Sequence, residues 1–325
     1  MTCPVCDYSG VKPRYRMRDR FFDSVPDEFV LHHCSSCGLM YLDEKEVASR
    51  IGEFYPPGYW WRSPDSGPGA LSSLESRYRN WMIRHDQLKF LQSAVPQPEG
   101  VRLLDVGCGN GTFLQAALEA GYDAYGLEQS AEACRIARRR VPEGRVIEGD
   151  ESALIERGEA FEVLTLFHAL EHIPGPFRYL KTLHKLLGRP GKLIVQVPNS
   201  DSWQARLFGS RWYGLDCPRH IFNYNTYALL HLLGRAGFRI HRLRHFSLRD
   251  NAACLASSLF PSLDPMSQKV RLLRRTGKRH SLGLALREAA YLPAFALAQP
   301  LAWLEARMGR GASITVYATL EDFPF

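Results

Sequence analysis

The chain has 325 residues, which is enough for one large domain with a small one beside it. Its apolar fraction of 45% and charged fraction of 23% are those of an ordinary globular protein, and no apolar stretch of about twenty residues predicts a transmembrane helix. The net charge of +7 permits an anionic partner without requiring one. The first residues lack the pattern of a signal peptide, so we expect a cytoplasmic protein.

Two pairs of cysteines with C-x-x-C spacing lie near the N-terminus. The four residues are Cys3, Cys6, Cys34 and Cys37. In a chain without an export signal, such pairs predict thiolate ligation of one tetrahedral Zn²⁺ and not disulfides. Four thiolates leave no open coordination position, so this zinc should be structural. His32 or His33 could substitute as a ligand, but the four-cysteine set is the simpler interpretation of a zinc-ribbon module over residues 1–42.

Residues 43–95 form the expected connector. A turn-rich, aromatic segment from Tyr55 to Trp61 comes first, and apolar residues at helical spacing then predict a helix over residues 74–95. The aromatic side chains of this helix either pack against the sheet or cover a ligand pocket, and we prefer packing.

The stretch from Val101 to Phe113 predicts a strand, a glycine-rich turn and the start of a helix. Three glycines, Gly107, Gly109 and Gly111, follow the strand at a spacing that differs from the G-x-G-x-x-G of dinucleotide-binding folds. They let the backbone turn sharply and let a ligand approach the helix N-terminus closely. Asp105, which precedes the turn, would repel a pyrophosphate, so a ligand with a neutral or cationic head is expected.

Strand and helix patterns alternate from residue 101 onward, which predicts a parallel sheet with helices on both faces. Further strands are expected at 123–128, 145–150, 161–168, 191–197, 238–247 and 313–320, the last pairing antiparallel beside the strand before it. Helices are expected at 112–118, 131–140, 174–187 and 227–237. Glu128 and Asp150 end the second and third strands, at the sheet edge where open α/β sheets bind ligands.

The D-x-G-x-G-x-G pattern from Asp105 to Gly111 resembles motif I of the class I S-adenosylmethionine (SAM) methyltransferases. The resemblance covers roughly residues 100–245 and resumes at the last strand. It implies an α/β fold with a Rossmann-like, seven-stranded sheet over residues 96–247 and 313–325. It also implies that Asp105 and the glycine turn hold the methionine end of SAM, that Glu128 holds the ribose, and that Asp150 and Glu151 flank the adenine.

The segment after the fourth strand resembles the L-E-H segment of many small-molecule methyltransferases. In some quinone O-methyltransferases an E-x-x-E-H pattern binds a divalent metal, but here His168 occupies the first position, ahead of Glu171 and His172. The functional interpretation makes His168 or His172 a general base near the methyl acceptor. The alternative is that Glu171 and His172 cap the next helix.

The loop after the fifth strand contains Trp212, Asp216 and His220. It resembles a W-x-x-x-D-x-P-x-H segment of methyltransferases that carry the same N-terminal zinc module. We expect Asp216 to orient the His220 imidazole, so that the pair could draw a proton from an acceptor hydroxyl. A hydrogen-bonded structural loop is an equally good explanation.

Residues 248–312 form an expected helical insertion before the last strand. It has a basic stretch, with Lys269, Arg271, Arg274, Arg275, Lys278 and Arg279, and then an apolar helix over 284–308 that Pro293 and Pro300 should break. Residues 265–308 could contact the inner face of an anionic membrane. A cap over the acceptor site or a homodimer interface would explain them equally well.

The first functional hypothesis is SAM-dependent methyl transfer to a small molecule, with a histidine base. A sugar, a polysaccharide precursor or a secondary metabolite is the expected acceptor. O-methylation is favoured because the chain lacks the Tyr-x-x-Glu-His run of sugar C-methyltransferases. The alternatives are a zinc-ribbon RNA methyltransferase and a non-catalytic SAM-binding protein. Nucleic acid is not the expected partner, because the zinc module has no evident base-stacking platform.

Overall fold

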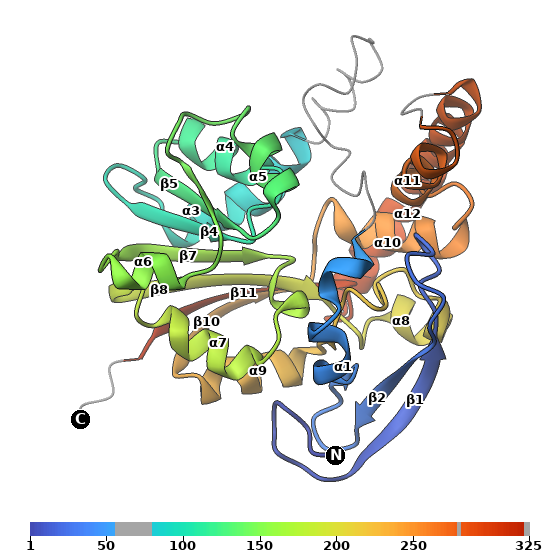
Figure 1. The fold of residues 1–325 in the computed structure, drawn as a ribbon, viewed down its shortest axis with the longest axis horizontal. Helices are drawn as coiled ribbons and strands as arrows, with labels where there is room; N and C mark the ends of the chain where they lie inside the picture. The colour runs from blue at the N-terminus through green and yellow to red at the C-terminus, as the bar shows by residue number, and fades with distance from the viewer. Residues whose placement is uncertain (56–79, 278–280, 322–325) are drawn as a thin grey trace.

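The computed structural model describes residues 1–55, 80–277 and 281–321, and its centre is a seven-stranded sheet (Figure 1). The strands, in spatial order, are β10 (Phe238–Arg244), β11 (Ser313–Leu320), β8 (Leu187–Pro198), β7 (Phe161–Phe167), β4 (Arg102–Val106), β5 (Asp123–Glu128) and β6 (Val146–Glu148). The strands from β8 to β6 are parallel, while β11 is antiparallel to both of its neighbours. This confirms the expected seven-stranded fold.

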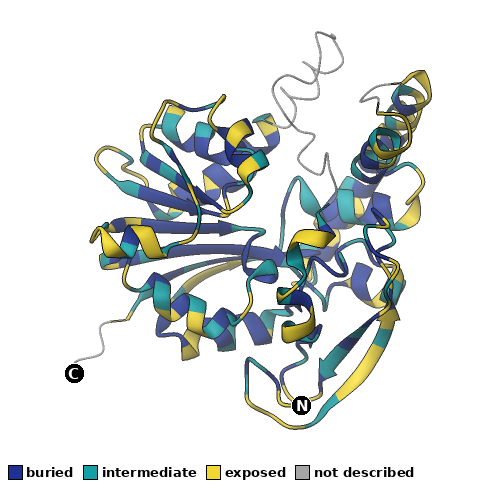
Figure 2. Cartoon of the chain, in the orientation of Figure 1, coloured by how far each residue is buried: buried dark blue, intermediate teal, exposed yellow. Residues whose placement is uncertain are grey.

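Helices cover both faces of this sheet, as the alternating pattern predicted (Figure 1). One face carries α3 (Lys89–Ala94), α4 (Thr112–Glu119) and α5 (Ala131–Ala137); the other carries α7 (Pro176–Leu183) and α9 (Thr226–Arg235), and a short α6 (Ser152–Glu156) follows β6. The central strands are buried between the two layers, while β10 at the edge is largely exposed (Figure 2). Of the helix expected over 74–95, the part from residue 80 is described, with a π-helical turn η2 (Arg84–Leu88) before α3. Residues 74–79 and the aromatic segment after Tyr55 lie outside the described residues.

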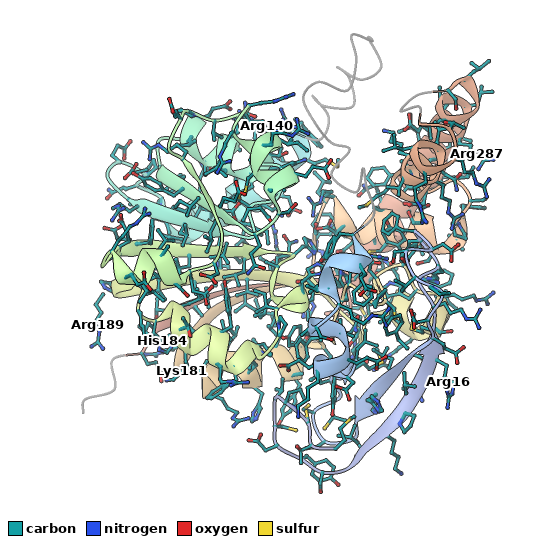
Figure 3. The ribbon with its side chains drawn as sticks, viewed as in Figure 1. Arg16, Arg140, Lys181, His184, Arg189 and Arg287 are labelled. Atoms are coloured by element: carbon teal, nitrogen blue, oxygen red, sulfur yellow. The ribbon has the colours of Figure 1, made fainter. Side chains whose placement is uncertain are left out.

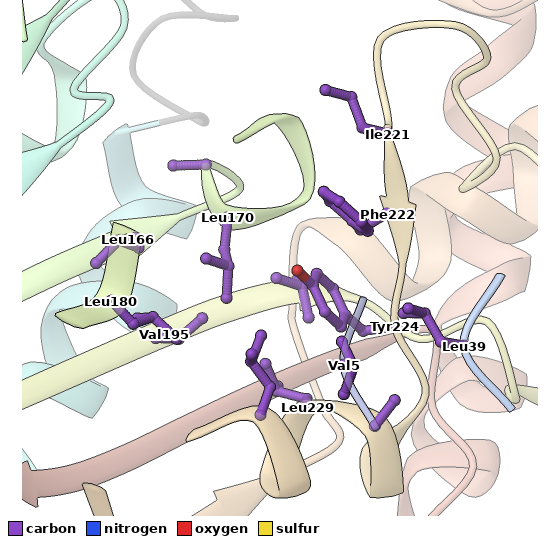
Figure 4. Packing of buried hydrophobic residues seen from close by; sticks show 14 of the residues in the cluster. Val5, Leu39, Leu166, Leu170, Leu180, Val195, Ile221, Phe222, Tyr224 and Leu229 are labelled. Atoms are coloured by element: carbon purple, nitrogen blue, oxygen red, sulfur yellow. The ribbon is translucent and has the colours of Figure 1, made fainter. Parts of the chain in front are cut away.

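The cysteine module is built into the large domain and does not stand apart from it. Its strands β1 (Val11–Met17), β2 (Phe29–Cys34) and β3 (Met40–Tyr41) form an antiparallel sheet that is completed by β9 (Phe222–Asn223), and α1 (Glu44–Ala48) and η1 (Ile51–Phe54) follow it. Figure 4 shows Val5 and Leu39 of the module beside Tyr224 and Leu229 of the large domain. The module therefore shares a hydrophobic core, so metal is not the sole source of its folding energy.

The insertion forms three helices, α10 (Asp250–Leu259), α11 (Pro265–Thr276) and α12 (Leu282–Arg307), with α11 and α12 projecting from the body (Figure 1). The expectation that Pro293 and Pro300 break the last helix is wrong, because α12 is continuous through both. The two prolines are seven residues apart and both exposed, so the carbonyl groups that lose their helical donors lie on the solvent side. Among the described residues, no helix has the length and apolar character needed to cross a membrane.

Side-chain hydrogen bonds anchor α11 and α12 to the rest of the chain. The guanidinium groups of Arg271 and Arg274 on α11 donate to backbone carbonyl groups of the module between Arg20 and Asp23. Near the end of α12, Glu305 accepts hydrogen bonds from Gln204 on α8 (Trp203–Phe208), which the short η4 (Gly209–Arg211) follows. Arg271 and Arg274 therefore help to fix the insertion in place, while Lys278 and Arg279 lie outside the described residues.

Candidate active site

One cavity of about 1240 Å³ runs along the carboxyl edge of the sheet. Over β4, β5 and β6 it is lined by Asp105, Gly107, Gly109, Glu128, Asp150 and Glu151, which we call the cofactor end. Beyond β7 it is lined by His168, His172, Asp216, His220, Arg249 and Asp250, which we call the acceptor end. The topology thus brings nearly all of the expected site residues of the large domain to one hollow. Gly111 is the exception, because it does not line the cavity.

The glycine turn has the shape that its sequence predicted. Gly107, Gly109 and Gly111 all have positive φ angles, of 70°, 54° and 74°, in the left-handed region that suits glycine. A Cβ atom on Gly111 would lie 2.9 Å from the Cβ of Ala137 on α5, which is too close. Gly111 therefore allows the turn to pack against α5, while the backbone of Gly107 and Gly109 lines the cavity.

Glu128 ties the ends of two loops together. Its carboxylate accepts hydrogen bonds from the backbone N–H of Gly109 at 2.9 Å and of Ser130 at 2.8 Å. Burial raises the pKa of this carboxyl, and these backbone donors oppose the rise. Each carboxylate oxygen keeps a second lone pair for a donor in the cavity. The residue therefore fits a ligand that offers hydroxyl groups, as a ribose does.

Asp105 lies deeper than its expected role implied. It is buried, one of its oxygens accepts the hydroxyl hydrogen of Thr165 at 2.7 Å, and burial raises the pKa of the carboxyl to about 7. At the far edge, Asp150 accepts the backbone N–H of Ser152 at 3.0 Å and is exposed, with Tyr179 among the residues lining the cavity nearby. Three acids thus follow one another along the cavity: buried Asp105, then Glu128, then exposed Asp150. In that order they fit the cationic head, the ribose and the adenine of one ligand.

His168 has both ring nitrogens engaged. Nε2 lies 2.9 Å from an oxygen of Asp250 on α10, and Nδ1 lies 3.3 Å from an oxygen of Glu171. Burial alone would lower the pKa of His168, but the charge of Asp250 and the hydrogen bonds to both carboxylates outweigh it and raise the pKa to about 9. The ring is therefore a cation at neutral pH that donates to two acids. His168 directly follows β7, and its backbone has a positive φ of 56°, which is strained for a residue with a side chain.

His172, in the 3₁₀ turn η3 (Leu170–His172), has the opposite electrostatic environment. Its Nδ1 lies 2.9 Å from the carbonyl oxygen of Arg219 and 3.2 Å from the hydroxyl of Tyr55. A carbonyl group can only accept, so Nδ1 carries the proton. Burial, and then the neighbouring His220, lower the pKa of His172 to about 4. The ring is neutral at pH 7, with an unprotonated Nε2.

Glu171, His172 and His220 form a compact cluster at the acceptor end. Their ligand atoms lie within 4.8 Å of one another, and the two imidazole ring centres are 4.7 Å apart. Glu171 is fully buried, and its Oε2 has no hydrogen-bond partner among the described residues. Although burial would raise the pKa of Glu171, the hydrogen bond from His168 and the nearby histidines lower it. This anionic cluster could stabilise a protonated imidazole or hold a divalent cation.

Asp216 does not orient His220, and that expectation of the sequence is corrected. The Asp216 carboxylate accepts from the guanidinium of Arg219 at 2.6 to 3.0 Å, while His220 Nδ1 lies 2.9 Å from the carbonyl oxygen of Gly214. Fully buried Arg219 also donates to Asp19 of the module at 2.8 and 2.9 Å, and this pairing outweighs burial to lower the pKa of Asp19 to about 2. Arginine, which is always charged, binds the carboxylate that the His220 ring was expected to contact.

The four expected metal-ligating cysteines meet at one point. They are all free thiols, and their sulfur atoms lie within 4.8 Å of one another. Sγ of Cys3 is 3.5 Å from that of Cys37, and Sγ of Cys6 is 3.6 Å from that of Cys34. Tetrahedral zinc with bonds of about 2.3 Å requires sulfur atoms about 3.8 Å apart, so this donor set fits the ion.

Several residues of the acceptor end were missed by the sequence patterns. Arg249 lines the cavity and donates through Nε to Asp250 at 2.6 Å; within the described part of the chain its terminal nitrogens have no hydrogen-bond partner. Aromatic rings of Phe21, Phe22 and Tyr213 also line it. Adjacent opposite charges at Arg249 and Asp250, at the start of an apolar helix, were the only local signal for any of these.

A family described as a methyltransferase domain matches residues 76–243, about half of the chain. Ubiquinone biosynthesis O-methyltransferases of Xanthomonas axonopodis pv. citri and Idiomarina loihiensis are each 30% identical to it, over 112 and 151 residues. These matches cover 33% and 44% of this chain, and 47% and 58% of the relatives, so the chain spans about half the length of the curated relatives it matches. A chain in the complex between the Haloferax volcanii Trm112 methyltransferase activator and a methyltransferase has the same fold, with a TM-score of 0.50 at 14% identity over 77% of this chain and 95% of that one.

Proposed function

Because the chain belongs to the methyltransferase-domain family of class I SAM-dependent methyltransferases, we propose that it methylates a hydroxyl group of a small-molecule acceptor. A sugar, a polysaccharide precursor or a secondary metabolite is the proposed acceptor class. The observation that carries the proposal is a single cavity that joins the glycine turn and its acids to the neutral imidazole of His172. The relatives named O-methyltransferases support transfer to oxygen.

The cofactor end would hold SAM through residues that were expected from the sequence. Glu128 would accept from the ribose hydroxyl groups, Asp105 and the backbone at Gly107 would face the methionine part, and Asp150 with Glu151 would flank the adenine. When bound, SAM supplies a methyl group that is already activated for attack. What this chain must add is alignment of the acceptor, exclusion of water and removal of one proton.

His172 is the proposed general base. Its Nε2 would take the proton of the acceptor hydroxyl as the oxygen forms its bond to the methyl carbon. The anionic carboxylate of Glu171 would stabilise the imidazolium that results, with His220 beside it. His168, a cation at neutral pH with both nitrogens engaged, would act as a positioning residue that holds Asp250 and Glu171 in place.

Arg249 gives the acceptor end a cation whose terminal nitrogens have no partner among the described residues, and the aromatic rings of Phe21, Phe22 and Tyr213 give it a flat apolar wall. We expect an acceptor with a ring and an acidic group, such as a phosphate or carboxylate. Guanidinium groups recognise both anions through paired N–H donors.

The four-cysteine cluster is the proposed site of one structural Zn²⁺. With all four ligands from the protein it has no open position for chemistry. Its contribution to function would be indirect, because the module it closes carries Phe21, Phe22 and Asp19 toward the acceptor end.

Two measurements test the proposal. Calorimetry should show saturable binding of SAM and S-adenosylhomocysteine that is lost in Glu128→Ala, and no binding to folded wild type would overturn the assignment.

Methyl transfer to catechols and nucleotide sugars should fall about 10²- to 10⁴-fold in His172→Asn while SAM affinity stays unchanged. His241→Asn, on exposed β10 away from the cavity, is the matched control. Undiminished transfer by His172→Asn would remove its role as the base, and loss of activity in EDTA, restored by Mg²⁺, would assign the Glu171 cluster to a cation instead.

A further inference from the structure

Helix α12 exposes an apolar face along its whole length. The exposed large apolar side chains are Leu282, Leu286, Leu292, Leu297, Leu301, Trp303 and Leu304, with Met308 directly after the helix. Leu282 and Leu297 are 78% and 73% exposed. The opposite face, with Tyr291, Phe295 and Ala298, packs against α10. A helix that is apolar all round is normally covered all round, so this face has the composition of a contact surface.

The charges on this helix are unevenly distributed. Its exposed charged residues are Arg287, which also donates to Gln268 on α11 at 2.6 Å, and Arg307, and no acid among the described residues of α12 is exposed. Glu305 is buried against Gln204, and Glu288 is only partly exposed and paired with Lys269 at 2.7 Å. Figure 3 shows Arg287 on the projecting arm formed by α11 and α12. The surface is thus apolar with positive charge only.

This charge pattern selects between the two occupants that could cover an apolar helix. A second copy of the chain would meet the same face through a two-fold axis, which sets arginines against a surface without acids to pair them. At an anionic lipid surface the leucine side chains can be buried in the interface, and the negative charge attracts the arginines. We propose that α12 lies along an anionic membrane surface, with its leucine face in the headgroup region.

The shape of the helix agrees with lying on a membrane and not with crossing it. Its 26 residues extend about 39 Å. The exposed Pro293 and Pro300 have no N–H to offer the carbonyl groups one turn earlier, which the hydrated interface can satisfy but the hydrocarbon core cannot. Trp303 on this face, stacked by Arg307 at 4.5 Å, has the amphipathic ring that favours such an interface. Membrane contact stands independently of the proposed methyl transfer, because α12 is distinct from the residues lining the cavity.

The test is co-sedimentation with vesicles of phosphatidylcholine alone and of phosphatidylcholine mixed with phosphatidylglycerol. Wild type should bind the anionic vesicles more tightly. Leu297→Glu and Leu301→Glu should each weaken binding roughly tenfold or more, because each removes a leucine from the apolar phase. Arg287→Gln with Arg307→Gln should reduce the preference for anionic vesicles, by roughly fivefold per arginine. Tyr227→Glu on α9, where the tyrosine is 62% exposed, is the matched control and should bind as wild type does.

All variants carry their change on the surface, and an unchanged melting temperature and SAM affinity will show that they are folded. Absence of wild-type binding to both vesicle types would overturn the proposal. So would a dimer in sedimentation velocity that Leu297→Glu dissociates, because a second copy would then cover the face. Equal binding of wild type and the two glutamate variants would place the lipid contact elsewhere on the chain.

Discussion

The ion pair between His168 and Asp250 should give the protein a pH-dependent stability. The rise in the pKa of His168 from its ordinary value of 6.5 to about 9 corresponds to about 3 kcal/mol, and its side chain is only 22% exposed. Because the folded state binds this proton more tightly than the unfolded state, the stabilisation is complete below about pH 6.5 and is lost as the pH rises through about 9.

Asp250→Asn should remove most of this contribution, because Glu171 remains as the second partner of His168. We expect the variant to lose about 2 to 3 kcal/mol more unfolding free energy at pH 6 than at pH 10, where His168 is already neutral in wild type. The loss that remains at pH 10 belongs to the other contacts of the Asp250 carboxylate, with Arg249 at 2.6 Å, Ser247 at 2.7 Å and Gln196 at 3.3 Å. Urea unfolding of both proteins at the two pH values gives the difference, in which the other titrating groups cancel.

The matched control is Asp27→Asn, which removes an acid paired with Arg50 at 3.0 Å on the surface. Its effect should be small and equal at pH 6 and pH 10, because no histidine titrates with it. If Asp250→Asn destabilises the protein equally at both pH values, His168 is not held as a cation and the reasoning fails. Titration of the His168 ring by NMR, identified by its absence in His168→Asn, would settle the same question directly.

Three further predictions concern other parts of the chain. Asp19→Asn should lower the free energy of unfolding by about 3 to 5 kcal/mol, since it leaves fully buried Arg219 with one acid instead of two; a urea midpoint unchanged from wild type would contradict this. Gly111→Ala should lower both the melting temperature and the affinity for SAM, because its φ of 74° and the nearby Ala137 leave no room for a Cβ, whereas Gly158→Ala, with open space around its Cβ, should affect stability alone. Metal analysis should find about one zinc per chain, and Cys34→Ser should bind less and melt earlier; equal zinc content would place the metal elsewhere.

Local patterns in the sequence were sufficient for the sheet and for the cofactor end of the cavity. The glycine turn, the acids that end β4, β5 and β6, and the alternation of strands and helices each depend on backbone geometry over a few residues. Parallel strands then bring their carboxyl ends to one edge without further information. The cysteine pairs were equally informative, because metal-ligand spacing restricts the local backbone.

The acceptor end depended on tertiary structure. Asp250 lies 82 residues from His168, and Tyr55 lies 117 residues from His172. Local sequence spacing predicts neither contact, because each joins residues of elements that are far apart in the sequence. The same holds for the pKa values. Burial lowers the pKa of both His168 and His172, but hydrogen bonds to Asp250 and Glu171 make His168 a cation, whereas burial and the neighbouring His220 keep His172 neutral.

The sequence by itself thus determined the fold, the cysteine cluster and the residues that line the cofactor end of the cavity, since each follows from short-range geometry. Tertiary structure decided that Asp216 binds Arg219 and not His220. The buried arginine also binds Asp19, which lies 200 residues away in the sequence, so this pairing exists only in the folded chain. It also decided that α12 runs unbroken through two prolines, because both face outward. The role of a charged or aromatic side chain depends on the residues that the fold packs against it, and sequence spacing does not predict those neighbours.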